Sequence, residues 1–137
     1  MQLTKSHLKH YTLPVLSESF WAYLAGFVDG EANIRKYWAR TTSVGENYGY
    51  EMVISQNREN GGEDVFNWIK SNLEIGHIRL RKLEKPEKDI FYLAISQREA
   101  LQKIWRKILP YTHIKTKIIV KMLDDIEQVY SQTAMHG

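Results

Sequence analysis

One stretch, Leu24-Ala25-Gly26-Phe27-Val28-Asp29-Gly30-Glu31, constrains the fold of this chain more than any other. It is typical of the end of a helix, and either Ser17 or Ser19 can cap the start of that helix. Apolar residues recur there at helical spacing, which gives the helix one face for a core. These residues are Phe20, Leu24, Phe27 and Val28.

A second stripe of the same helix consists of Tyr23, Gly26 and Gly30, spaced three and four residues apart. A glycine inside a helix costs about 1 kcal/mol relative to alanine. Glycine is retained where another backbone must approach closely, and the usual partner is a second helix. The stripe therefore predicts a helix–helix interface.

The helix ends in two acids, Asp29 and Glu31, on either side of Gly30. Carboxylates near a helix C-terminus are penalised by about 0.3–1 kcal/mol each, because that end carries partial negative charge. Acids in this position indicate that a cation binds nearby.

The composition fits one globular domain with a full-sized core, since 43% of the 137 residues are hydrophobic. There is no cysteine, which excludes a disulfide framework and a thiolate metal site. No apolar run approaches the roughly 20 residues of a membrane span, and the N-terminus lacks the apolar segment of a signal peptide. We expect a soluble intracellular protein with an arm over residues 1–17, one domain over 18–130 and a polar tail over 131–137.

The net charge of +3 is a weak indication of a nucleic-acid partner, and its distribution is more informative. Residues 100–123 contain six basic side chains and no acid. Taken alone, that region is as often a solvated helix face. Arg79, Arg81 and Lys82 form a second basic cluster.

Strand and helix patterns alternate along the rest of the chain and predict an α+β fold. Strands are expected over 33–41, 48–55, 77–83 and 90–96, and helices over 63–75, 98–109 and 116–130. Pro110 ends the second of these helices, and Val120 is expected on the apolar side of the third. The order fits one antiparallel four-stranded sheet with helices on one face.

The opposite face of that sheet is predicted to be polar and hydrogen-bonding. An antiparallel sheet with one wet side is the plain interpretation. The alternative is a surface that reads bases in the DNA major groove, where arginine pairs with guanine and asparagine with adenine. The outward set is Asn33, Arg35, Tyr37, Thr41, Asn47, Glu51, His77, Arg79, Arg81 and Tyr92.

The stretch at residues 24–31 resembles the signature of the LAGLIDADG homing endonucleases. The predicted element order over residues 18–130 also resembles that family, whose αββαββα core has a saddle-shaped sheet backed by helices and straddles double-stranded DNA. Two letter changes fall at positions that carry the chemistry: glutamate at position 31, where aspartate is usual, and Ala32, where glycine often follows. Glutamate can still bind a metal, so the resemblance implies a metal-dependent endonuclease.

The resemblance also implies which residues perform the chemistry. The Glu31 carboxylate and the Gly30 carbonyl would hold Mg²⁺ or Mn²⁺, which prefer oxygen ligands. Taken alone, Glu31 is more often an ordinary helix-end acid, but the signature in front of it reverses that preference. Gln56 matches a residue that positions a metal-bound water, and Lys115 matches one that acts on the phosphate or the water.

Neighbouring residues leave alternatives open. Lys117 and His113 lie close to Lys115 in the sequence and could take its part. Asp29 is expected to be structural, capping its own helix end or that of a partner.

One signature per chain implies a homodimer, because cutting both strands requires two sites. The two signature helices would cross at Tyr23, Gly26 and Gly30. By resemblance, such an enzyme is intron-encoded, cuts a long pseudo-palindromic target and leaves short 3′ overhangs. The main alternative is a non-catalytic nucleic-acid-binding protein on the same fold, either an intron maturase or a transcription regulator. A module that only dimerises is the third possibility, which the basic clusters disfavour.

Overall fold

The structure is a computed structural model that describes residues 10–38 and 48–136, with side chains to residue 129. In chain order the helices and strands are α1 (Glu18–Glu31), β1 (Ala32–Trp38), β2 (Tyr48–Asn57), α2 (Gly62–Leu73), β3 (His77–Arg81), β4 (Ile90–Ile95), α3 (Arg98–Ile108) and α4 (Thr116–His136). Short 3₁₀ turns lie at Arg58–Asn60, Pro86–Lys88 and Leu109–Tyr111. Pro110 sits in the last of these turns, where α3 ends as predicted.

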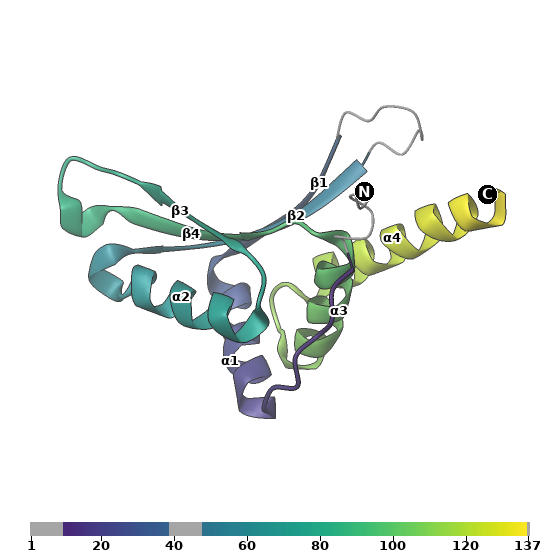
Figure 1. The fold of residues 1–137 in the computed structure, drawn as a ribbon, viewed down its shortest axis with the longest axis horizontal. Coiled ribbons are helices and arrows are strands. Elements are labelled where there is room, and N and C mark those ends of the chain that lie inside the picture. Colours follow the sequence, from purple (N-terminus) through teal and green to yellow (C-terminus); the bar gives the residue numbers. More distant parts are fainter. Residues whose placement is uncertain (1–9, 39–47, 137) are drawn as a thin grey trace, which may run out of the picture.

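The four strands form one antiparallel sheet in the order β1-β2-β4-β3. Helices α1, α2 and α3 cover one face of this sheet, and both ends of the sheet curve away from them (Figure 1). The opposite face is therefore concave and uncovered by helices. The predicted α+β architecture with a saddle-shaped sheet is confirmed.

The first helix forms where the sequence predicts it. The Ser17 side chain caps it, accepting a hydrogen bond from the Phe20 N–H at 3.1 Å. The helix stops because Ala32 is already extended and begins β1, so α1 passes directly into the sheet. Its buried side chains are Phe20, Trp21, Leu24, Ala25 and Val28.

Alternation along β2 separates the two faces of the sheet. Alternation along residues 48–55 predicts an apolar face that includes Tyr50, Met52 and Ile54. These three side chains are almost fully buried against the helices. Leu80 of β3 shares the helix side of the sheet with its cross-strand partner Phe91, but it remains 40% exposed.

The segment before α1 connects helices α2 and α3 through Tyr11. The Tyr11 hydroxyl donates a hydrogen bond to the carbonyl of Leu73 at the end of α2, at 2.7 Å. The carbonyl of Tyr11 accepts another from Lys103 Nζ of α3, also at 2.7 Å. This part of the expected arm is therefore packed on the domain and bridges two helices.

Candidate functional site

The C-terminal end of α1 carries the signature acid to the sheet. Glu31 is the last residue of the helix, and both it and Gly30 are exposed. α1 rises to the underside of the sheet and ends there (Figure 1). The fold therefore places Glu31 in an exposed position at the junction of helix and sheet.

A cation does lie at this helix end, and it belongs to the same chain. Lys115 Nζ donates to the carbonyl of Asp29 at 3.0 Å and to that of Val28 at 3.3 Å. These carbonyls belong to the last turn of α1, where the helix carries partial negative charge. The fold thus brings the Lys115 ammonium to the two carbonyls that directly precede Gly30 and Glu31 in the chain.

Asp29 fixes the segment that carries this lysine. Its carboxylate accepts hydrogen bonds from the backbone N–H groups of His113, Ile114 and Lys115, at 2.7, 3.0 and 2.9 Å. Burial, the largest influence, would raise the pKa of Asp29, but the three N–H groups outweigh it and hold that pKa below its usual value. Asp29 is structural, as predicted, but it holds the turn before α4 rather than a helix end.

Gln56 lies on β2 near the point where α1 passes into β1, but its hydrogen bonds are made to the turn that follows β2. It is two residues further along β2 than Ile54, the cross-strand partner of Ala32. Its Oε1 accepts from the Asn57 N–H at 2.9 Å and from Asn60 Nδ2 at 3.4 Å. In this arrangement Gln56 orders the turn after β2, and its predicted work on water stays a prediction.

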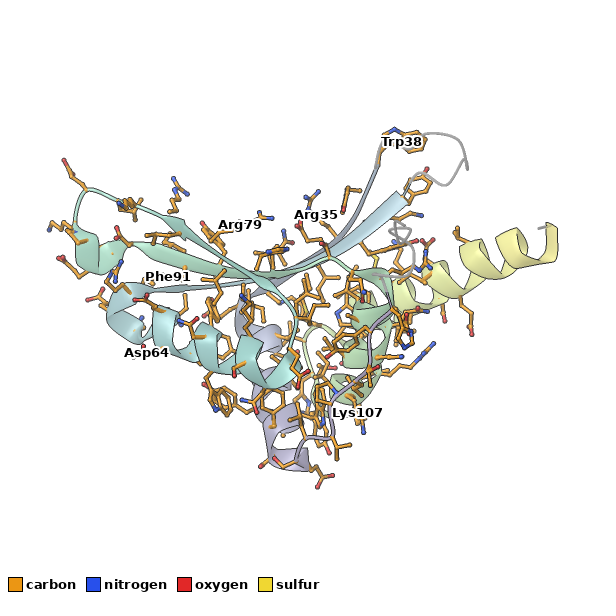
Figure 2. The ribbon with its side chains drawn as sticks, viewed as in Figure 1. Arg35, Trp38, Asp64, Arg79, Phe91 and Lys107 are labelled. Atoms are coloured by element: carbon orange, nitrogen blue, oxygen red, sulfur yellow. The ribbon has the colours of Figure 1, made fainter. Side chains whose placement is uncertain are left out.

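The concave face of the sheet carries the predicted polar side chains. Figure 2 shows Arg35 and Arg79 above the sheet, on the side opposite the helices. Strand parity places the rest of the described set with them, namely Asn33, Tyr37, Glu51, His77, Arg81 and Tyr92. Thr41 and Asn47 lie outside the described residues. The shared face agrees with the prediction, while contact with DNA stays a prediction.

The small-residue stripe of α1 faces outward. Tyr23 is 48% exposed, and Gly26 and Gly30 are also exposed. A Cβ added at Gly26 or Gly30 would meet no atom within 4 Å. The described part of the chain gives neither position a steric reason to be glycine.

Trp68 of α2 borders this stripe, and the sequence reasoning did not identify it. Its ring makes an edge-on contact with Tyr23 at a centroid separation of 5.6 Å and is 48% exposed. The apolar stripe of α2 consists of Phe66, Ile69 and Leu73. Trp68 lies outside this stripe, and a large apolar side chain in such a position indicates a contact other than the core of its own chain.

Among residues 10–38 and 48–129, no three acidic, histidine or cysteine side chains gather as a ready metal site. Within the described residues no helix is long and apolar enough to span a membrane.

Solved structures of homing endonucleases share this fold. I-CvuI in complex with its target matches with a TM-score of 0.66 and 20% identity over 85% of this chain and 71% of that chain. The archaeal intron-encoded I-Vdi141I complexed with DNA matches at 0.59 and 20% identity over 85% of this chain and 72% of its own. I-LtrWI bound to target DNA matches at 0.60 and 18% identity over 87% of this chain but only 40% of its own.

These similarities define the class: the chain has the fold of a homing endonuclease. The profile of the LAGLIDADG endonucleases matches residues 24–127, which is most of the chain. The protein therefore belongs to the LAGLIDADG endonuclease family, as its signature predicts. No curated protein sequence matches it significantly.

Proposed function

We propose that this protein is a homodimeric, site-specific DNA endonuclease that hydrolyses phosphodiesters with a divalent metal. The observation that carries this proposal is the exposed Glu31 carboxylate at the end of α1, with the Lys115 ammonium on the neighbouring helix-end carbonyls. Membership of the LAGLIDADG endonuclease family supports the same chemistry.

The donors at this position fit Mg²⁺ or Mn²⁺. Glu31 offers an exposed carboxylate and Gly30 an adjacent backbone carbonyl, and such hard oxygen ligands suit these ions. The ion would activate a water and stabilise the charge on the phosphate. Lys115 would add positive charge beside the reacting phosphate, and Gln56 would orient water.

A second copy would complete the site. One described chain gathers too few ligands for a metal by itself, and one active site cuts one strand. The exposed stripe of Tyr23, Gly26 and Gly30 suits a twofold contact between two α1 helices, which would set their acidic ends side by side. The match to only 40% of I-LtrWI leaves room in that longer chain for two such units.

The concave sheet would bind the DNA major groove through its outward side chains. Two sheets related by a twofold axis would read a long, pseudo-palindromic target, and cleavage would leave short 3′ overhangs. An intron-encoded role fits the family. The alternative is an intron maturase or transcription regulator without cleavage. The presence of Glu31, Lys115 and Gln56 together favours the enzyme, because these are the three positions to which the family resemblance assigns the chemistry.

Cleavage by a Glu31→Gln variant tests the proposal. A target would first be selected from random duplexes by binding and then incubated with protein and Mg²⁺. The parent protein should linearise a plasmid carrying the target, whereas Glu31→Gln should bind it with similar affinity and cut at least about a hundredfold more slowly. Glu127→Gln, at an exposed acid of α4, should cut like the parent. Normal cleavage by Glu31→Gln would refute the metal assignment, and tight binding by the parent without cleavage would favour the regulator.

A further inference from the structure

Arg35 and Glu51 form an ion pair on the concave face of the sheet. They are direct cross-strand partners in β1 and β2. Glu51 Oε1 lies 2.9 Å from Arg35 Nε and 2.9 Å from Arg35 Nη2. The Glu51 side chain is only 13% exposed and that of Arg35 is 53% exposed, so the acid lies beneath the guanidinium.

The geometry leaves one edge of the guanidinium open. Because Oε1 takes Nε and Nη2 together, it occupies the side edge of the planar group. The end edge, formed by the remaining N–H groups of Nη1 and Nη2, stays available. That end edge makes two parallel hydrogen bonds with the O6 and N7 atoms of guanine in the major groove.

The neighbouring cross-strand pair holds the same group from another side. The Tyr37 ring lies over Gly49, where any Cβ would collide with it. The Arg35 guanidinium in turn lies over the Tyr37 ring, with Cζ 4.9 Å from the ring centroid. A glycine at position 49 therefore lets Tyr37 lie across β2 and support Arg35.

A contribution to folding stability does not explain the arrangement of Arg35, Glu51 and Tyr37. The Arg35 side chain is 53% exposed, so water screens the pair and its contribution to folding is small. A carboxylate on a surface that faces phosphates also opposes binding. Tied to Arg35, the same carboxylate fixes the arginine before DNA arrives. Arg79 offers a contrast. Its cross-strand partner is Tyr92, and among the described residues no acid forms an ion pair with it.

We propose that Arg35 reads one guanine in each half of the target and that Glu51 positions Arg35 without contacting the DNA itself. This inference rests on the proposed function, since it requires DNA on the concave face. It reassigns Glu51 from a base-contacting residue to a positioning residue.

Selection of bound duplexes from a random library, with EDTA present to prevent cleavage, tests the inference. The full-length parent should enrich guanine at one symmetric pair of positions. Arg35→Ala should reduce that preference at least about tenfold, and Glu51→Gln should reduce it several-fold at the same positions. The double variant should lose no more than Arg35→Ala, because the two residues act as one unit. Arg79→Ala is the matched control and should alter different positions.

Arg35→Lys separates reading from simple charge. It should lose the guanine preference yet keep most of the overall affinity, because lysine lacks the planar fork. Circular dichroism of every variant should match the parent. Glu51→Gln acting at a position that Arg35→Ala leaves unchanged would overturn the inference, as would an equal loss of affinity for all sequences in Arg35→Ala. A parent that enriches no sequence would instead refute the proposed function and the inference with it.

Discussion

Asp29 shows how a single residue of the signature connects distant parts of the chain. A carboxylate at a helix C-terminus is unfavourable, yet Asp29 accepts three backbone N–H groups from residues 113–115. These donors precede α4, and without Asp29 they would lose that partner. The same turn delivers Lys115 to the end of α1. The acid therefore sets the position of the lysine without reacting itself.

Asp29→Asn should separate this positioning role from binding. The amide group replaces one accepting oxygen with a donor that faces other donors, so we expect a loss of about 1–3 kcal/mol in the free energy of unfolding. Cleavage should fall more than DNA affinity, because Lys115 shifts. Urea unfolding and single-turnover cleavage measure the two effects. Asp124→Asn, at an exposed acid of α4, should change neither.

The lowered pKa of Asp29 also predicts how stability depends on pH. A group whose folded pKa is depressed stabilises the protein fully above its ordinary pKa of 3.8 and loses that contribution as pH falls through the folded value. The free energy of unfolding of the parent should therefore decline below about pH 4, and Asp29→Asn should show a shallower decline. Equal slopes in the two proteins would contradict the assignment.

The segment before α1 works as an element, tying α2 to α3 through Tyr11. Burial, aided by the charge of Glu74, raises the pKa of the Tyr11 hydroxyl to about 12. Because the folded pKa is raised, its stabilisation is complete below the ordinary value of 10 and is lost as pH rises toward 12. This is the opposite pH dependence to that of Asp29.

Tyr11→Phe should cost about 1–2 kcal/mol at neutral pH, since the carbonyl of Leu73 loses its donor. The variant should also lose less stability than the parent between pH 8 and pH 11. Denaturant titrations at both values measure this. Tyr92→Phe, on the concave face of the sheet, is the control and should match the parent at both.

Sequence periodicity predicted most elements because they depend on neighbours in the chain. Alternation in β2 placed Met52 and Ile54 correctly in the core. Helical periodicity failed at Val120 of α4, which was predicted on the apolar side but is 40% exposed, while Ile119 is fully buried. Three successive apolar residues, Ile118 to Val120, leave the phase of a helix undefined, and only packing against the rest of the fold decides it.

The site divides in the same way. The signature pointed to Glu31, and resemblance alone pointed to Lys115. The bonds between Asp29 and residues 113–115 span more than eighty positions in the chain, which no local pattern can encode. Likewise, Glu51 shares a face with Arg35 by simple alternation, but their ion pair depends on strand register.

At the level of the whole molecule, we expect Gly26 to lower the stability of the monomer and to favour assembly of the dimer. In the single chain Gly26 is exposed and has free space for a Cβ, and alanine favours a helix over glycine by about 1 kcal/mol. Gly26→Ala should therefore raise the melting temperature of the dilute monomer. In a dimer crossed at this position, two added methyl groups would face each other and separate the helices, so the dimer dissociation constant should rise at least about tenfold.

Sedimentation equilibrium over a range of concentrations measures that constant, and thermal unfolding at low concentration measures the monomer. Ser71→Ala, at an exposed position of α2 away from the stripe, should raise helix stability without changing association. Gly26→Leu should abolish the dimer, and double-strand cleavage should disappear with it. An unchanged dissociation constant in Gly26→Ala would mean that the helices do not cross there, and the two Glu31 carboxylates would then have no means of meeting opposite strands.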